Sequence, residues 1–299
     1  MAKKFTVVGL GEVLWDLLPT GKLLGGAPTN FAYISTLLGD RGIVASRIGS
    51  DDLGHEAMER LATLGVETSY LQRDASHPTG TVKVQVDRRG QPRFTILEDV
   101  AWDFLRWNQQ WKQLARRVDA VCFGSLAQRS PCSRRTITQF LQNTRAIRVF
   151  DVNLRQRFFS AAVLRQSIAM ATIVKMNQDE LPVILRLLNL ETSDGKLDAK
   201  QLLEFGPRLV CITRGDRGSV LLTRRATAEH PGFFIRVRDT IGAGDAFTAA
   251  LVHAYLRGAS LEEMNEAANR MGSWVASQAG GTPTVGKKEL RRELAELEV

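Results

Sequence analysis

Short runs of apolar residues alternate along this chain with longer segments in which apolar residues recur at helical spacing. The apolar runs cover 5–11, 42–49, 119–124, 147–152, 173–176 and 209–213, and they predict strands that are buried on both faces. The clearest helical patterns cover 25–39, which ends at Gly39, and 50–65, which begins with Ser50 and two aspartates. This alternation predicts a mostly parallel sheet covered by helices.

The segment 79–96 has a different pattern. Val82, Val84 and Val86 alternate with polar residues, the letters DRRG follow, and the alternation resumes with Phe94 and Ile96, as in an antiparallel hairpin. Together with residues 14–24, this hairpin is expected to form a small lid sheet. Its exposed edge needs a partner surface, so a homodimer contact through the lid is plausible on physical grounds. With no internal repeat or linker rich in Pro, Gly and Ser, residues 1–299 are predicted to form one α/β domain, with lid insertions at about 13–25 and 79–104.

Composition and charge narrow the class of protein. The net charge is +8, but the arginine pairs are spread along the chain between acidic residues, which argues against nucleic-acid binding and would suit a polyphosphate substrate. The first apolar run is interrupted by Glu12, so neither a signal peptide nor a membrane span is expected there. Three scattered cysteines and four histidines show no disulfide or zinc-binding spacing. We therefore expect a cytoplasmic protein.

The stretch DTIGAGDAF, residues 239–247, carries the strongest chemical signal. Two glycines precede a helical pattern that is expected to begin at Asp245 and to end at Arg257 and Gly258. Unpaired N–H groups at a helix start favour an anion, and an aspartate there competes with that anion unless it has its own task. In phosphoryl transfer, the glycine turn would stabilise negative charge and Asp245 would accept the hydroxyl proton. A capped helix with a favourable dipole interaction is the alternative.

These residues resemble the C-terminal signature of the ribokinase-like carbohydrate kinases, the PfkB family. The resemblance implies that Asp245 is the catalytic base and that Gly242, Ala243 and Gly244 form the anion hole. The stretches GEVLWDLLP, GGAPTNFA and DVNLRQR are similar to elements that contact substrate in the family, and imply substrate-binding roles for Asp16, Gly25, Gly26, Asn30 and Arg155.

Alternatives from the residues themselves stay open at these three stretches. An ordinary helix start would explain 25–32, and a salt bridge would explain Arg155. Trp15 would either stack on a sugar face or pack within the lid.

Two further stretches, KMNQDE and TRGDRG, resemble the nucleotide-binding elements of the same family. They imply that ATP is the phosphoryl donor and that it is bound by Asn177, Thr213, Gly215, Gly218 and Asn269. Mg²⁺ would be held through water by Glu180, and a monovalent cation such as K⁺ by Asp239 and the carbonyl group of Ile241. Considered without the family, Asn177 and Glu180 are a helix cap and its capping-box partner, and TRGDRG is a hairpin turn.

The matching motifs occur in family order from residue 9 to residue 284. The resemblance implies a ribokinase-like three-layer α/β/α fold and ATP-dependent phosphorylation of a primary hydroxyl of a small sugar. D-fructose is the expected substrate, because GEVLWDLLP and the segment around 79–96 are most similar to fructokinases. Ribose, 2-keto-3-deoxygluconate and adenosine are alternative substrates, and a catalytically silent sugar sensor is the alternative from another functional class. The intact Asp245 argues against a sensor, and FTILEDVAWDFL lacks the arginine of the keto-sugar-acid kinases.

Overall fold

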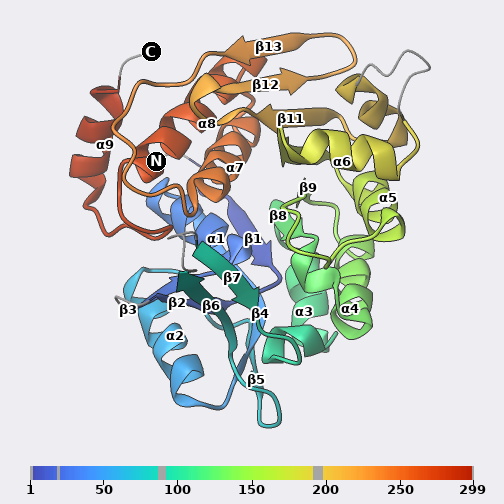
Figure 1. Ribbon diagram of the computed structural model, residues 1–299, viewed down its shortest axis with the longest axis vertical. Helices are drawn as coiled ribbons and strands as arrows, with labels where there is room; N and C mark the ends of the chain where they lie inside the picture. The colour runs from blue at the N-terminus through green and yellow to red at the C-terminus, as the bar shows by residue number, and fades with distance from the viewer. Residues whose placement is uncertain (1–2, 19–20, 87–91, 191–197, 298–299) are drawn as a thin grey trace.

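A nine-stranded sheet forms the centre of the molecule (Figure 1). The computed structural model describes residues 3–18, 21–86, 92–190 and 198–297. Strand order is β13-β12-β11-β10-β9-β8-β1-β4-β5. The pairs from β11 to β5 are parallel, and β12 and β13 are added antiparallel at one edge. The strands are β1 (Thr6–Leu10), β4 (Arg41–Gly49), β5 (Leu71–Asp74), β8 (Ala120–Gly124), β9 (Ile147–Asp151), β10 (Ile173–Asn177), β11 (Leu209–Thr213), β12 (Ser219–Leu222) and β13 (Thr227–His230).

Helices cover both faces of this sheet and make two hydrophobic cores. Successive residues of β1 show the alternation, because Val8 and Leu10 enter one core while Val7 enters the other. The first core contains residues from α3 (Gln109–Ala115), α4 (Pro131–Gln142), α5 (Ala161–Met170) and α6 (Glu180–Leu187). The second contains residues from α1 (Ala27–Leu37), α2 (Asp52–Thr63), α7 (Ala243–Tyr255), α8 (Leu261–Ala276) and α9 (Lys287–Ala295). The expected three-layer α/β/α architecture is therefore confirmed.

The strands expected from the apolar runs are all present, but three elements differ from expectation. Four-residue strands β5 and β13 were not expected, because their mixed sequences LQRD and TAEH carry little apolar signal. Helix α7 begins at Ala243, so the expectation that it starts at Asp245 is wrong. The reason is that only Gly242 adopts a left-handed conformation, whereas Gly244 joins the first helical turn. None of the helices within the described residues is long and apolar enough to cross a membrane.

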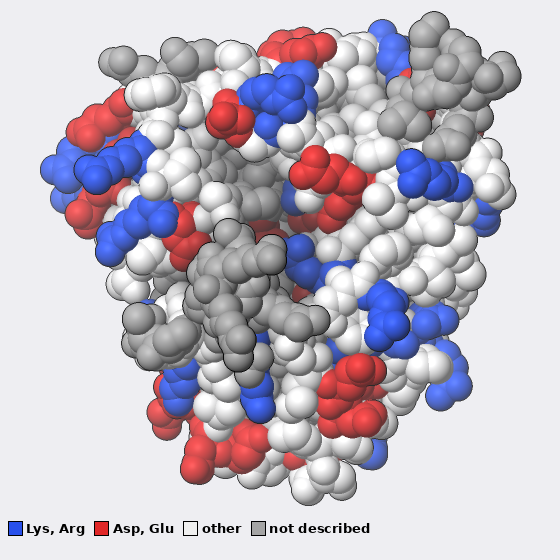
Figure 2. Space-filling model, viewed as in Figure 1, with Lys and Arg blue, Asp and Glu red and all other residues white. Residues whose placement is uncertain are grey.

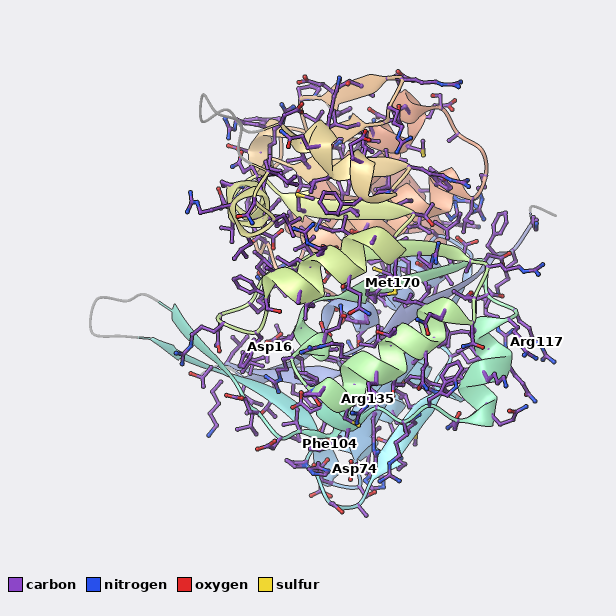
Figure 3. The ribbon with its side chains drawn as sticks, turned by 90° about the vertical axis from the view of Figure 1, so that its right-hand side faces the viewer. Asp16, Asp74, Phe104, Arg117, Arg135 and Met170 are labelled. Carbon is purple, nitrogen blue, oxygen red and sulfur yellow. The ribbon has the colours of Figure 1, made fainter. Side chains whose placement is uncertain are left out.

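The smaller sheet has the order β3-β2-β6-β7, with bounds β2 (Leu14–Leu18), β3 (Gly21–Gly25), β6 (Gly80–Val86) and β7 (Pro92–Ile96). The expected antiparallel pairing of β6 with β7 is present; its turn, 87–91, and the side chains of Val84, Val86 and Phe94 lie outside what the structure describes. A parallel pairing of β2 with β6, which sets Leu14 opposite Gly80, joins the two sequence insertions into one sheet. Figure 3 shows this sheet projecting from the body.

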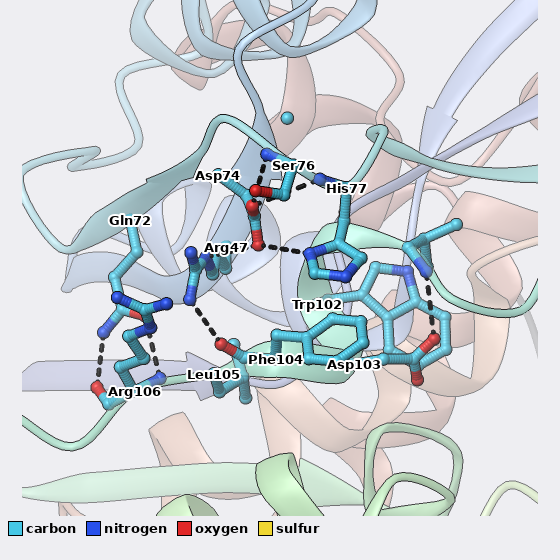
Figure 4. A network of polar contacts seen from close by, with 12 residues as sticks. Arg47, Gln72, Asp74, Ser76, His77, Trp102, Asp103, Phe104, Leu105 and Arg106 are labelled. Atoms are coloured by element: carbon cyan, nitrogen blue, oxygen red, sulfur yellow. Dashed lines mark hydrogen bonds and ion pairs between the residues drawn. The ribbon is translucent and has the colours of Figure 1, made fainter.

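A polar network fixes the loop that connects β5 to β6 at the base of the small sheet (Figure 4). Asp74 accepts hydrogen bonds from the backbone N–H groups of Ser76 and His77, and from Nδ1 of His77 at 3.0 Å. The buried guanidinium of Arg47 lies 2.9 Å from the same carboxylate and donates to the carbonyl oxygen of Phe104 at 2.7 Å. His77 and Phe104 stack with ring centroids 3.6 Å apart. These contacts tie both ends of the β6–β7 hairpin to the body.

Arg129 makes a second connection between the small sheet and the body. Its side chain is only 6% exposed and forms a bidentate pair with Asp103, with N–O distances of 2.8 and 2.7 Å. It also donates to the carbonyl oxygen of Leu97, just beyond β7, at 2.6 Å. The guanidinium also lies over the rings of Trp102 and Phe158, 4.0 and 4.6 Å from their centroids. Arg129 is therefore a buried junction of several elements.

Candidate active site

One hydrogen bond joins the two motifs that the sequence analysis selected at opposite ends of the chain. Nδ2 of Asn30 donates to Oδ2 of Asp245 at 2.7 Å, across a separation of 215 residues. Asn30 lies in the first turns of α1 and Asp245 in the first turn of α7, and these two helices pack side by side on one face of the sheet. Oδ1 of Asn30 is buried without a partner among the described residues, so this amide oxygen is available to accept a hydrogen bond from a ligand.

Gly242 provides the turn from which α7 begins. Its φ is 77°, a left-handed conformation that L-residues adopt only at a cost. A β-carbon on Gly242 would also collide with the Cα of Gly281, in the loop that follows α8. Conformation and packing therefore both require glycine here.

We expect Gly242→Ala to lower the free energy of unfolding by about 2 kcal/mol or more and to reduce turnover, because backbone strain adds to the collision with Gly281. Gly258→Ala is the matched control. Gly258 ends the same helix region with a φ of 74°, but a β-carbon there would meet nothing within 4 Å. Urea unfolding of both variants separates strain from collision; equal losses would show that the contact with Gly281 does not matter.

The backbone of the turn leaves donors for an anion. The N–H of Ala243 donates to the carbonyl oxygen of Thr240 at 3.3 Å, so it is already used within the turn. No described residue accepts a hydrogen bond from the N–H groups of Gly242, Gly244 and Asp245. Gly242 and Gly244 of the predicted anion hole thus keep N–H groups available for an anion, and Asp245 adds a third at the positive end of α7.

On the opposite wall, the paired glycines lie against the side chain of Asp16 and the backbone of Glu12. Asp16 lies on β2, partly exposed, where the small sheet meets the body (Figure 3). A β-carbon on Gly25 would lie 2.7 Å from Oδ2 of Asp16, and one on Gly26 would lie 2.5 Å from the carbonyl oxygen of Glu12. Gly26 also has a φ of 104°. The glycines therefore allow the carboxylate of Asp16 and the backbone of Glu12 to approach the start of α1.

Trp15 does not share this location. It is 4% exposed, belongs to the core that contains α1 and α2, and donates from Nε1 to the carbonyl oxygen of Leu53 at 2.9 Å. Because successive strand residues point to opposite faces, it faces away from Asp16. Stacking of Trp15 on a sugar is therefore wrong, and its side chain instead packs against the body, in the core that contains α1 and α2.

The pKa of Asp245 is raised to about 7. Burial is the main cause, and the charge of Asp151 acts in the same direction, while the Asn30 hydrogen bond and the charges of Lys175 and Arg155 oppose it. A carboxylate with a pKa near neutral pH is well matched to accepting a proton from a hydroxyl group.

Two further carboxylic acids share this electrostatic environment. Burial raises the pKa of Glu12 to about 7 and that of Asp16 to about 6, and in both the charge of Arg155 lowers the pKa. No described acidic side chain pairs with Arg155 within 4 Å, so the salt bridge considered for it is absent from the described structure. Three carboxylic acids thus share the longer-range influence of one guanidinium.

We expect kcat/KM for sugar phosphorylation to fall below about pH 7, by about tenfold per pH unit or more, because the base must be ionised. Glu12 and Asp245 influence each other, so the apparent pKa values belong to the group as a whole. Initial rates between pH 5.5 and 8.5, with coupling enzymes in excess, test this. A flat profile would contradict the assignment of Asp245 as a base with a raised pKa.

Asn177 and Glu180, which are expected to lie near the nucleotide, hydrogen-bond to each other in the turn that leads into α6. Oδ1 of Asn177 accepts from the N–H groups of Asp179 and Glu180, both at 2.9 Å. The carboxylate of Glu180 returns to the N–H of Asn177 at 2.8 Å and also accepts from the N–H of Leu154 at 2.7 Å. The capping box expected from the residues alone is therefore present. Each carboxylate oxygen keeps a further lone pair, which leaves room for a water-mediated contact with Mg²⁺.

The other residues expected to bind ATP gather at the turn between β11 and β12. Thr213 ends β11, directly beside Asn177 in the parallel register. Gly215 and Gly218 adopt left-handed conformations in the turn itself, with φ of 64° and 71°. Asn269 reaches this turn from α8 and donates to Oγ of Ser219 at 2.8 Å. These residues therefore lie near one another, at the carboxyl end of β11.

Asp239, expected to bind a monovalent cation, joins two loops. Its Oδ1 accepts from the N–H of Ile241 and its Oδ2 from the N–H of Gly280, both at 3.0 Å. The side chain thus ties the start of the glycine turn to the loop after α8. No group of three or more His, Cys, Asp or Glu side chains within the described ranges is arranged to hold a metal ion.

Three polar residues at the centre of the site were not singled out from the sequence. Lys175 and Asp151 form a buried ion pair at 3.1 Å, and Thr248 donates to the same aspartate at 2.8 Å. Lys175 and Asp151 lie inside the quoted stretches KMNQDE and DVNLRQR. The available signal was a charged residue in the middle of the apolar run at Lys175 and another at the strand end at Asp151, which is unusual unless such residues are paired.

Both halves of the site lie at the carboxyl ends of the parallel strands, where open α/β sheets bind ligands. Figure 2 shows that this face of the molecule is hollowed beside the small sheet, and that acidic and basic side chains border the hollow.

Comparison with known proteins identifies a family and several proteins that this chain resembles. Residues 19–287 match the sequence pattern of the pfkB family carbohydrate kinases. The fructokinase of Klebsiella pneumoniae is 31% identical over 258 residues, which cover 81% of this chain and 82% of the relative. The structure of an uncharacterized sugar kinase from Pyrococcus horikoshii in complex with ATP is 28% identical, with a TM-score of 0.80 over 97% of this chain and 99% of that one. The fold is also that of aminoimidazole riboside kinase from Salmonella enterica, with a TM-score of 0.80 at 23% identity over 97% and 99% of the two chains.

Proposed function

Because the chain belongs to the pfkB family of carbohydrate kinases and is an ATP-dependent sugar kinase, we propose that it transfers the γ-phosphoryl group of ATP to a primary hydroxyl group of D-fructose. The observation that carries this proposal is the hydrogen bond of Asn30 to Asp245, because it unites the helix expected to bind sugar with the base and the glycine turn.

In the proposed reaction, Asp245 takes the proton of the acceptor hydroxyl group while the oxygen of that hydroxyl group attacks the γ-phosphorus. The bond from that phosphorus to the bridging oxygen breaks, and ADP leaves with the electron pair. The N–H groups of Gly244 and Asp245 stabilise the negative charge on the transferred group. Asp16, Gly25, Gly26 and Asn30 orient the sugar, and Arg155 balances the charge of the nearby acids.

ATP would be held by Asn177, Thr213 and the glycine turn between β11 and β12, with Asn269 behind it. Mg²⁺ neutralises phosphate charge when it is bound, and Glu180 would contact it through water. K⁺ would lie beside Asp239 and the carbonyl group of Ile241.

An uncharged sugar suits this site better than an anionic one. Glu12, Asp16 and Asp245 are three acids that share the influence of Arg155, and only Asp245 is also influenced by Lys175, so a phosphate or carboxylate on the acceptor would meet net repulsion. Identity to fructokinases favours fructose among the neutral sugars. A nucleoside or another sugar is the second candidate, since aminoimidazole riboside kinase shares the fold.

An ADP-release assay with Mg-ATP and K⁺ tests the proposal. The acceptors are fructose, ribose, glucose, tagatose, 2-keto-3-deoxygluconate, fructose 6-phosphate and adenosine. We expect the highest kcat/KM for fructose and the lowest for the two anionic compounds. Faster turnover of another neutral acceptor would replace fructose and keep the mechanism, whereas preference for an anionic acceptor would contradict the charge argument. Silence across the panel from folded protein that binds ATP would favour an untested sugar or a sensor.

A further inference from the structure

Lys175 is a buried cation at the centre of the molecule. It lies on β10 directly beside Asp151 of β9, and its Nζ is 3.1 and 3.2 Å from the two carboxylate oxygens. The side chains of Lys175 and Asp151 are 9% and 4% exposed. The hydroxyl group of Thr248 of α7 lies 2.8 Å from the same carboxylate and 3.0 Å from the carbonyl oxygen of Gly244. The ion pair is thus connected to the first turn of α7.

The ammonium group explains the second glycine of the GAG turn. Gly242 needs its left-handed conformation, but Gly244 is not among the glycines with positive φ. A β-carbon on Gly244 would instead lie 2.9 Å from Nζ of Lys175 and 3.9 Å from its Cε. Lys175 therefore packs directly against the backbone of Gly244, whose N–H group no described residue uses.

The surroundings keep Lys175 charged. Burial acts to lower its pKa, but the charges of Asp151, Asp245 and Glu180 outweigh burial and raise the pKa. An ammonium group has three N–H donors, and the two oxygens of Asp151 account for at most two of them. At least one donor is left for a group at the glycine turn.

We propose that Lys175 is the fixed cation of the anion hole: held by Asp151 against Gly244, it stabilises the negative charge of the γ-phosphoryl group during transfer. The inference rests on the proposed kinase function and adds a residue to it. Proton and electrons move as described above, with the hydroxyl proton passing to Asp245, so Lys175 remains protonated throughout. Backbone dipoles at the helix start and a full positive charge then act on the same phosphoryl oxygens.

If the ion pair had only a structural role, a folded variant without both charges would keep its turnover and its affinity for ATP. A double variant tests this. Removing Lys175 alone would leave Asp151 buried and uncompensated, and would destabilise the protein in either case. The variant K175M/D151N removes both charges and keeps similar side-chain volumes, so it is expected to fold. Thr248 can still donate to the amide oxygen that the D151N change leaves at this position.

The experiment compares wild type, K175M/D151N and the control R257M/D40N, which removes an ion pair between the buried carboxylate of Asp40 and the partly exposed Arg257, just beyond the other end of α7. Circular dichroism establishes folding, turnover with the best acceptor gives kcat, and calorimetry gives the Kd of ATP and of ADP. For K175M/D151N we expect kcat to fall about 10²–10³-fold. ATP should bind about tenfold more weakly and ADP unchanged, because only ATP carries the γ-phosphate. The control should keep its kcat and both affinities.

Turnover of folded K175M/D151N within about threefold of wild type, with unchanged ATP affinity, would overturn the inference and leave Lys175 as the partner of Asp151 only. The affinity ratio separates this failure from a failure of the kinase proposal. Suppose that wild type phosphorylates no acceptor, but the double variant binds ATP more weakly than wild type while its affinity for ADP is unchanged. The proposed function then fails, whereas the role of Lys175 as the cation that binds the γ-phosphate is supported.

Discussion

Asp245→Asn is expected to lower kcat by about 10²–10⁴-fold, the usual effect of removing a positioned general base. The amide has the same shape and can keep a hydrogen bond with Asn30, but it cannot accept the hydroxyl proton. Sugar and ATP should bind nearly as before, so the loss appears in kcat rather than in KM. Steady-state kinetics with fructose and ATP varied in turn would measure this separation.

Stability gives the same variant a second readout. The folded state raises the pKa of Asp245 above its ordinary value, so its contribution to stability is complete below that ordinary value and is lost as the pH rises through about 7. Asparagine carries no charge at any pH. We therefore expect Asp245→Asn to unfold at pH 8 at a temperature no lower than that of wild type.

Asp52→Asn is the matched control, because Asp52 lies in the first turn of α2 and is exposed. It removes a carboxylate from a helix start without touching the site, and should leave kcat unchanged. A normal kcat for Asp245→Asn would remove the basis for the proposed mechanism.

Arg129→Met should lower the free energy of unfolding by about 3–5 kcal/mol, the range for breaking one half of a buried ion pair. The change leaves Asp103 without its bidentate partner and frees the carbonyl oxygen of Leu97. It also ends the contacts of the guanidinium with Trp102 and Phe158. Urea titration followed by fluorescence would measure the loss.

Arg41→Met provides the contrast. Arg41 pairs with Glu67 at the surface, where its side chain is 51% exposed, and such pairs contribute about 1 kcal/mol or less. In the double variant R129M/D103N, the orphaned charge is removed as well, so part of the stability should return. Similar losses for Arg129→Met and Arg41→Met would mean that burial at the lid base does not strengthen the pair.

The local pattern was sufficient for most of the elements, whereas the candidate residues were selected by the resemblance to the carbohydrate kinases. Apolar runs such as FTVVGLG predict strands because a strand buried on both faces has no polar positions, and the glycine turn before α7 is visible because glycine permits what other residues do not. The four-residue strands β5 and β13 were missed because they are short and mixed in character, and their pairing with longer neighbours defines them.

The sequence by itself therefore determined the α/β class, the hairpin of the small sheet and the residues expected to bind sugar and ATP. Only the tertiary structure decided that Asn30 contacts Asp245, that Trp15 faces away from Asp16, and that Lys175 lies against Gly244. The physical reason is that strand order and helix packing are set by the whole core. These contacts join residues on different strands and helices, and neither spacing nor local propensity contains that order.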